Sequence, residues 1–218
     1  DFDYLDSNKK EFVKTVLPII INENQNILMI RSFVSELKGK LETFRTLNNK
    51  EIRKLNDIAN KYKINYHNKH KLDLVDEILS NVDVIPNSIA LAQAAIESGW
   101  GKSRFAKEYN ALFGEYTYDN SKGVIPLERE NGDTHLIRAF SSYSNSVESY
   151  FNNINSHYAY EDFRDIRNIM RKRNNFSNVN LLVNKLSTYA ADENYIKTIR
   201  QVIKTNKFSI FDQKTISY

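Results

Sequence analysis

The chain has 218 residues, of which 41% are hydrophobic and 27% are charged, and its formal net charge is +4. This length and apolar content suffice for one hydrophobic core and argue against two independent domains. The absence of cysteine excludes disulfides, thiolate metal sites and a cysteine nucleophile, but it leaves the compartment open. The moderate positive charge favours an anionic polymer, such as a cell wall with carboxylates or phosphates. Nucleic acid would also fit the charge, but no nucleic-acid-binding module is recognisable.

Apolar residues at helical spacing predict helices throughout the first third of the chain. Residues 9–21 form an apolar helix that Pro18 should kink, and residues 27–47 form an amphipathic one. Two shorter helices are expected over residues 50–61 and 72–80. No apolar run has the length needed to span a membrane, so we expect these helices to pack in a core.

The next helix is rich in small residues and ends on an acid, within the segment ALAQAAIESGWGKSRFAKEYNALFG. Helical spacing places Gln93 and Glu97 on one face with small alanines beside them. Alanines let neighbouring helices approach closely, so we expect Glu97 to be partly desolvated, which favours a protonated carboxyl suited to acid catalysis. Gly99 and Gly101 predict the end of the helix, with the aromatic surface of Trp100 next to the acid. By position alone, Glu97 could instead be a solvated surface group.

After a short helix over residues 102–109, the pattern changes and predicts a small β lobe over residues 113–140. Helical patterns then return over residues 146–156, 161–172, 179–186 and 192–204, with Asp192 as a helix cap. We therefore predict a mainly α (α+β) fold. It consists of a lysozyme-like helical domain with a small β-hairpin lobe, preceded by N-terminal helices.

The densest basic segment lies in the helix over residues 161–172 and just beyond it. Its cations are Arg164, Arg167, Arg171, Lys172 and Arg173, interleaved with Asp162 and Asp165. Because opposite charges recur at helical spacing, we expect a solvated helix face with internal ion pairs.

Several motifs together resemble one enzyme family. Residues 96–106, reading IESGWGKSRFA, followed by NALFG at residues 110–114, resemble the core of the glucosaminidase family of peptidoglycan hydrolases. Further segments resemble its Bax-like branch in matching order, at residues 85–95, 123–126, 132–135, 138–140, 146–150, 157–160 and 163–164.

The resemblance implies a hydrolase that cleaves the β-1,4 bond after N-acetylglucosamine in peptidoglycan, with Glu97 protonating the leaving oxygen. It implies residues 83–218 as the catalytic domain, with residues 1–82 as a helical portion packed on it, and no metal or organic cofactor. It also implies a periplasmic or secreted protein. Since the chain starts at Asp1 and shows no signal peptide, we expect a mature or trimmed form.

Glycoside hydrolysis usually needs a second carboxylate. Glu128 and Glu130 lie where many family members carry an acid on the β lobe, and strand alternation lets only one of them face the groove. We favour Glu128 as catalytic and place Glu130 at the substrate. Glu115 and Asp133 are weaker candidates.

The acetamido group of the substrate could instead supply the nucleophile. A tyrosine would then orient this group or the developing charge. The segment from Tyr189 to Tyr195 resembles the family sequence Tyr-Ala-Thr-Asp-Pro-x-Tyr, although Ala191 and Glu193 replace the threonine and the proline. We choose Tyr189 for this role and Tyr195 second.

Aromatic side chains desolvate the apolar face of a sugar well. The candidates for substrate binding are Trp100, Phe113, Tyr116 and Tyr118, with the amide of Gln93, although core filling is the stronger interpretation for Phe113. Two rival functions use the same features: a lytic transglycosylase with the same acid, and a noncatalytic module that binds cell-wall glycan.

The histidines do not suggest a metal site or a nucleophile with its base. His67 and His70 would be spaced for chelation on a helix, but no third ligand lies nearby, so we expect two exposed loop histidines. We expect structural roles for His135 and His157.

Overall fold

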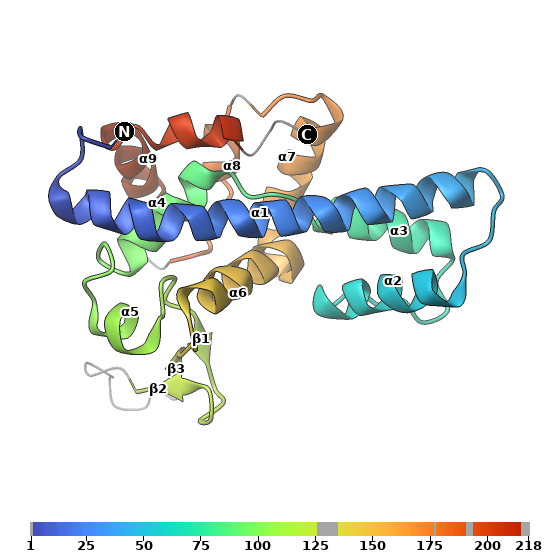
Figure 1. Cartoon of the computed structure of the whole chain (residues 1–218), viewed down its shortest axis with the longest axis horizontal. Helices are drawn as coiled ribbons and strands as arrows, with labels where there is room; N and C mark the ends of the chain where they lie inside the picture. The colour runs from blue at the N-terminus through green and yellow to red at the C-terminus, as the bar shows by residue number, and fades with distance from the viewer. Residues whose placement is uncertain (1, 126–134, 177, 191–193, 215–218) are drawn as a thin grey trace. The chain divides into compact units, whose positions relative to one another are not determined.

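The computed structural model of the chain describes residues 2–125, 135–176, 178–190 and 194–214. Helices dominate, and the strands form one small antiparallel sheet, which confirms the predicted mainly α class with a small β lobe (Figure 1). The α-helices are α1 (Ser7–Glu42), α2 (Asn49–Lys61), α3 (Lys71–Asn81), α4 (Asn87–Glu97), α5 (Arg104–Tyr109), α6 (Tyr143–Ser156), α7 (Glu161–Lys172), α8 (Asn180–Val183) and α9 (Tyr195–Thr205). The 3-10 helices are η1 (Tyr158–Tyr160) and η2 (Phe208–Lys214), and the strands are β1 (Tyr116–Thr117), β2 (Gly123–Val124) and β3 (Leu136–Arg138). Within the described ranges, no helix combines the length and apolar character needed to cross a bilayer.

Helix α1 corrects one prediction, because it runs unbroken through Pro18, where the sequence suggested a kink and two separate helices. Pro18 is exposed, and its ring removes only one helical hydrogen bond. Val16, Leu17 and Ile20 around it are buried. Their burial offsets the local cost of the proline and keeps the helix continuous.

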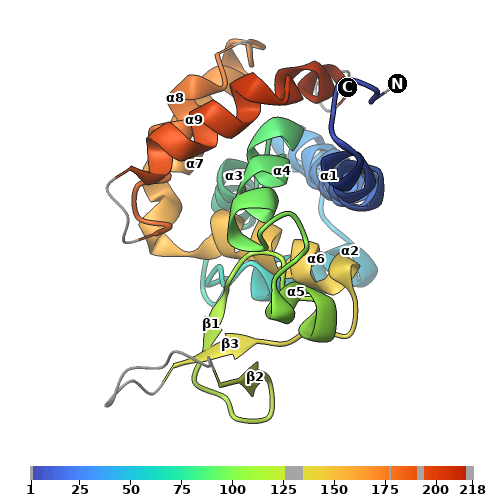
Figure 2. The same ribbon diagram turned by 90° about the vertical axis from the view of Figure 1, so that its left-hand side faces the viewer.

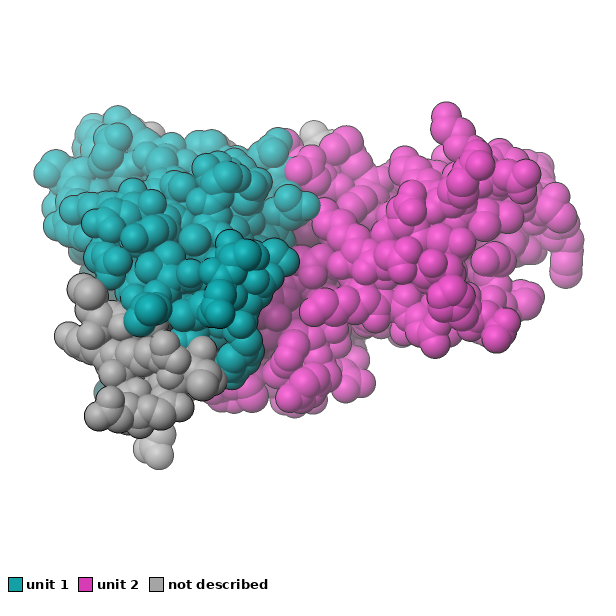
Figure 3. Space-filling model, turned by 90° about the horizontal axis from the view of Figure 1, so that it is seen from below, with its two compact units in different colours: residues 1–23, 86–150, 197–217 teal, residues 24–85, 151–196, 218 magenta. Residues whose placement is uncertain are grey.

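Two compact units make up the chain, and Figure 3 colours them separately. Unit 1 consists of Asp1–Glu23, Pro86–Tyr150 and Lys197–Ser217, and unit 2 of Asn24–Ile85, Phe151–Ile196 and Tyr218. Each unit combines segments that are far apart in the sequence. Residues 1–82 contribute to both units. The division of the chain into a helical portion (residues 1–82) and a catalytic domain (residues 83–218) stays a prediction.

Helix α4 lies at the centre of unit 1, and its N-terminus is held by a distant segment. Pro86 precedes the helix and offers no side-chain cap. Instead, Asp212 of η2 accepts hydrogen bonds from the backbone N–H of Ser88 at 2.8 Å and from its hydroxyl at 2.7 Å. Asn87 donates to the carbonyl of Phe211 at 2.9 Å. These contacts satisfy groups that a buried helix start would otherwise leave unpaired.

The β lobe of unit 1 has β3 between β1 and β2, and both pairs are antiparallel. Tyr116 lies opposite Ile137, and Gly123 lies opposite Arg138. In Figure 2, α5 and the three strands lie below α4. The chain thus runs from the helix that carries Glu97 through α5 into the lobe.

The prediction of a solvated basic face on α7 was wrong. Arg164 and Arg167 are buried in unit 2, and Arg171 is half-buried. Arg164 donates to main-chain carbonyls of residues 154 and 157, and Arg167 to those of residues 81, 83 and 84. The arginines lie on the packed side of the helix because their guanidiniums satisfy these carbonyls, which no local charge pattern reveals.

Burial raises the pKa of the Asp212 carboxyl to about 6, although the hydrogen bonds from Ser88 oppose the rise. Because this value exceeds the ordinary 3.8, the stability that the group contributes is full below about pH 4 and is lost as the pH rises through about 6. The free energy of unfolding should fall by roughly 2–3 kcal/mol through this group as the pH rises from about 4 to about 7. Asp212→Asn stays neutral at every pH, so its free energy of unfolding should fall less between about pH 4 and about pH 7 than that of the wild type. Urea denaturation at several pH values measures this dependence. Asp165→Asn, at an exposed position, should show the same dependence of unfolding free energy on pH as the wild type. If Asp212→Asn also shows the wild-type dependence, the raised pKa of Asp212 is not the cause of the fall.

Candidate active site

Glu97 is the last residue of α4 and is half-buried, so the predicted helix end is confirmed. The residues of α4 from Asn87 to Ala95 are all buried. The carboxyl is thus carried on a rigid helix at the point where that helix leaves the core of unit 1.

A tight turn ends α4 directly after the acid. Gly99, Trp100 and Gly101 all have positive φ, at 56°, 58° and 73°. The Ser98 hydroxyl donates to the Ala94 carbonyl and accepts a hydrogen bond from the N–H of Gly101 at 2.8 Å. A left-handed conformation is unfavourable for a bulky residue such as tryptophan, and this kind of local strain clusters at functional sites.

Gly114 brings the β lobe into contact with the acid. Its φ is +62°, and a Cβ added there would lie 3.2 Å from Oε2 of Glu97. Glycine is therefore needed both for the left-handed backbone and for the close approach. The preceding segment is held in place by Asn110, whose side chain donates to the carbonyl of Phe140 at 3.0 Å.

Gln93 and Phe113 lie in the core of unit 1. Gln93 is fully buried and accepts a hydrogen bond from the Tyr150 hydroxyl at 2.6 Å. The ring of Phe113 stacks on that of Tyr150, with centroids 4.0 Å apart and planes 8° from parallel. Because Gln93 and Phe113 are buried, we favour a structural role for them, in which they support α4 and the β lobe. Contact of either residue with substrate stays a prediction.

The two tyrosines of the β lobe are exposed. Side chains of Tyr116 and Tyr118 are 65% and 75% exposed, and the Tyr116 ring lies 4.4 Å from that of His135. Both present aromatic surface to solvent, which suits the predicted stacking on sugar rings.

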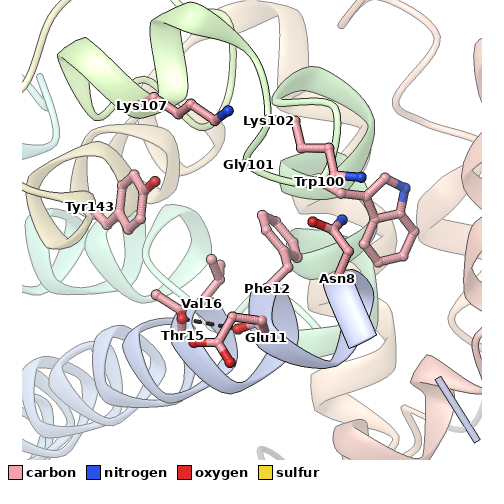
Figure 4. A pocket seen from close by; sticks show the side chains of 10 residues that line it. All are labelled: Asn8, Glu11, Phe12, Thr15, Val16, Trp100, Gly101, Lys102, Lys107 and Tyr143. Atoms are coloured by element: carbon pink, nitrogen blue, oxygen red, sulfur yellow. Dashed lines mark hydrogen bonds between the residues drawn. The ribbon is translucent and has the colours of Figure 1, made fainter. Parts of the chain in front are cut away.

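Trp100 packs against other aromatic residues of unit 1. Its ring contacts Phe12 and Phe208 edge-on, with centroids at 5.7 and 6.0 Å, and Nζ of Lys9 lies 5.1 Å from the ring centre. The indole also lines a hollow of about 370 Å³. Figure 4 shows Trp100 beside Phe12, with Tyr143 across the hollow.

Glu115, which the sequence offered only as a weak catalytic candidate, forms a partly buried cluster with Ser149 and Arg138. Its Oε2 accepts a hydrogen bond from the Ser149 hydroxyl at 2.8 Å and lies 3.8 Å from Nη1 of Arg138. Burial raises the pKa of Glu115, and the Ser149 hydrogen bond and the Arg138 charge only partly oppose this rise. The cluster ties the start of β1 to α6 and β3.

The other candidates fall elsewhere. Glu128, Glu130, Asp133 and Asp192 lie outside the described residues. In unit 2, the rings of Tyr189 and Tyr195 are parallel with centroids 5.8 Å apart, and Tyr195 is buried. Both stay predictions.

His67 and His70 are exposed, and Nδ1 of His70 accepts a hydrogen bond from the N–H of Leu72 at the start of α3. Nδ1 of His157 caps η1 in the same way. In the part of the chain that the structure describes, no cluster of three or more His, Asp or Glu side chains is placed to hold a metal ion.

The contact between Tyr150 and Gln93 should stabilise unit 1. Tyr150→Phe keeps the stacked ring and removes the hydroxyl that Gln93 accepts from, so the free energy of unfolding should fall by about 1–2 kcal/mol. Chemical denaturation would measure this change. The exposed Tyr118→Phe should change stability by less than about 0.5 kcal/mol, and a comparably small loss for Tyr150→Phe would show that the buried hydrogen bond contributes little.

Comparison with protein families matches residues 72–208 to the glucosaminidase family, described as mannosyl-glycoprotein endo-beta-N-acetylglucosaminidase. Protein bax of Escherichia coli (strain K12) is 32% identical over 184 residues, which cover 84% of this chain and 63% of that protein. Peptidoglycan hydrolase FlgJ of the same strain is 34% identical, over 37% of this chain and 29% of FlgJ. The chain thus spans less than two thirds of either relative.

Among solved structures, the catalytic domain of the autolysin Auto from Listeria monocytogenes aligns with a TM-score of 0.46 and 19% identity. The alignment covers 82% of this chain and 96% of that domain.

Proposed function

Because the chain belongs to the glucosaminidase family and is similar to Protein bax, we propose that it hydrolyses the β-1,4 bond after N-acetylglucosamine in peptidoglycan, with Glu97 as the general acid. The name of FlgJ, a peptidoglycan hydrolase, supports the polymer. Activity on peptidoglycan in turn supports a location outside the cytoplasm, periplasmic or secreted.

The placement of Glu97 carries the assignment of the acid. The residue ends a buried helix and is half-buried, and its Oε2 lies so near Gly114 that a Cβ there would be 3.2 Å away, at the entrance to the β lobe. A general acid needs a fixed position and a partly desolvated surrounding, so that its proton reaches the leaving oxygen. Exposed Tyr116 and Tyr118 on the lobe suit the binding of sugar rings.

For the second catalytic group we keep two proposals. In the first, Glu128 of the β lobe acts as nucleophile or base. In the second, the acetamido oxygen of the substrate attacks, and Tyr189 orients it. Tyr189 is half-buried against Tyr195, which would limit its motion and suits an orienting role.

The proposal is tested by digesting purified peptidoglycan with the wild-type chain and with Glu97→Gln, followed by mass spectrometry of the products. Removal of the proton donor should lower the rate of cleavage by at least about 100-fold. Glu108→Gln is the matched control, because Glu108 is an exposed residue of α5 that pairs with Arg104. It should retain wild-type activity.

Reducing-end N-acetylglucosamine products that disappear with Glu97→Gln would support the proposed hydrolase. Anhydro-muramyl products would assign the chain to the lytic transglycosylases. Glycan binding without any product from the wild-type chain would assign it to noncatalytic wall-binding modules.

A pair of glycine variants tests the contact between the β lobe and the acid. Gly114 and Gly99 have similar positive φ, but a Cβ at Gly99 meets nothing within 4 Å, whereas a Cβ at Gly114 meets the Glu97 carboxyl. Both alanine variants should lose about 1–2 kcal/mol of stability from the strained backbone. Only Gly114→Ala should also lose about tenfold or more in kcat, because displacing a catalytic group lowers its efficiency. Equal rates for the two folded variants would show that the contact does not position the acid.

A further inference from the structure

Two arginines contact the single buried carboxylate of Asp83 in unit 2, and a third binds the main-chain carbonyl of the same residue. Arg171 binds the fully buried Asp83 in a bidentate fashion, from Nε at 2.9 Å and from Nη2 at 2.6 Å. Nε of Arg31 lies 3.4 Å from the same carboxylate. Arg167 donates to the carbonyl of Asp83 at 3.0 Å and to the side chain of Asn155 at 2.7 Å. Within the described residues, these guanidiniums have no other acidic partner within 4 Å.

The cluster therefore carries more positive than negative charge. Burial lowers the pKa of Arg167 to about 9, and repulsion from Arg31, Arg164 and Arg171 adds to the effect while Asp83 opposes it. Burial likewise lowers the pKa of Arg31, with a further contribution from the charge of Arg171. Guanidinium groups in proteins keep their positive charge near neutral pH. An added anion would be attracted strongly because their surroundings are poorly screened.

A hollow of about 600 Å³ gives access to this charge. It is lined by Arg31 and Arg171 together with Ser80, Asn168 and Lys172. In the described part of the chain, Nη2 of Arg31 and Nη1 of Arg171 donate no hydrogen bond, and Lys172 has no ion-pair partner. Several donors on α1, α3 and α7 thus remain available around one space.

Two acids also line the hollow, and both are already paired. Asp76 lies 2.7 Å from Nζ of Lys38, another lining residue, and Glu77 pairs with Lys69. The Ser80 hydroxyl accepts a hydrogen bond from Asn168 at 2.7 Å, which leaves its proton free to be donated. The acids therefore do not cancel the excess charge of the arginine cluster.

We propose that this hollow binds a phosphate group, free or esterified to a sugar or polyol. Donors on three helices line the hollow, and the several oxygens of a phosphate can accept from more of them than the two oxygens of a carboxylate can. A phosphate dianion also matches a cluster in which the guanidiniums of Arg31 and Arg171 share one carboxylate and Arg167 adds a further positive charge. The site goes beyond the proposed glycan cleavage and does not depend on it.

Heteronuclear NMR of the arginine Nε–H groups tests the proposal on the whole chain. Inorganic phosphate, added at constant ionic strength, should shift the signals of Arg31 and Arg171 in a saturable way. Glycerol 3-phosphate serves as the esterified probe, and acetate serves as the carboxylate control. Tighter binding of glycerol 3-phosphate would assign the site to esterified phosphate, and equal or weaker binding would assign it to free phosphate.

Exposed residues at the end of α7 provide matched variants, which avoids removing an arginine that the fold needs. Lys172→Glu should weaken phosphate binding by about fivefold or more. Arg173→Glu makes the same charge change on the neighbouring residue, which does not line the hollow, and should stay within about twofold of wild type. The proposal is overturned if phosphate gives no saturable shift, if acetate binds as tightly as phosphate, or if the two variants weaken binding equally.

Discussion

The burial of α4 is the constraint on which the rest of unit 1 depends. A helix whose residues 87–95 are all buried must have its terminal backbone groups satisfied by protein. Asp212 accepts from the backbone N–H of Ser88 at the N-terminus, where Phe211 also holds the Asn87 side chain, and the Ser98 hydroxyl donates to the Ala94 carbonyl at the C-terminus. Ile96 and Glu97 are the residues of α4 that are only half-buried. The carboxyl therefore emerges where the helix leaves the core, on a support that can hardly move.

This arrangement explains which parts of the site could be predicted from the sequence. Helical spacing and two glycines located the end of α4 at Glu97, because both are local properties. The contact of Glu97 with Gly114 and the partnership of Ser88 with Asp212 join residues 17 and 124 positions apart. Such contacts depend on tertiary packing, and no pattern within one helix encodes them. For the same reason, α1 continues through Pro18, since the packing around a proline decides whether it breaks a helix.

The arginines of α7 show the limit of reasoning from charge alone. Alternating signs at helical spacing are typical of a solvated face, and at that level Arg164 and Arg167 do not differ from surface residues. Their burial depends on carbonyl groups of residues 81, 83 and 84 and of residues 154 and 157, which need donors once they are removed from water. Each guanidinium has five donors and can satisfy several carbonyls at once. The side chains that looked most available to a partner therefore hold unit 2 together.

Because some arginines are buried, the net charge of the chain overstates the positive charge that a partner can contact at the surface. A formal charge of +4 suggests diffuse attraction to an anionic polymer. Part of the positive charge, however, lies on the buried side chains of Arg164 and Arg167 in unit 2, which offer almost no surface for direct contact with a polymer. Of the arginines around Asp83, Arg31 and Arg171 line one hollow, together with Lys172. Salt screens long-range attraction between exposed charges over roughly 10 Å, but it weakens the field of partly buried charges much less. Attraction of an anion to this hollow would therefore depend on how the donors around it are arranged as well as on the net charge of the chain.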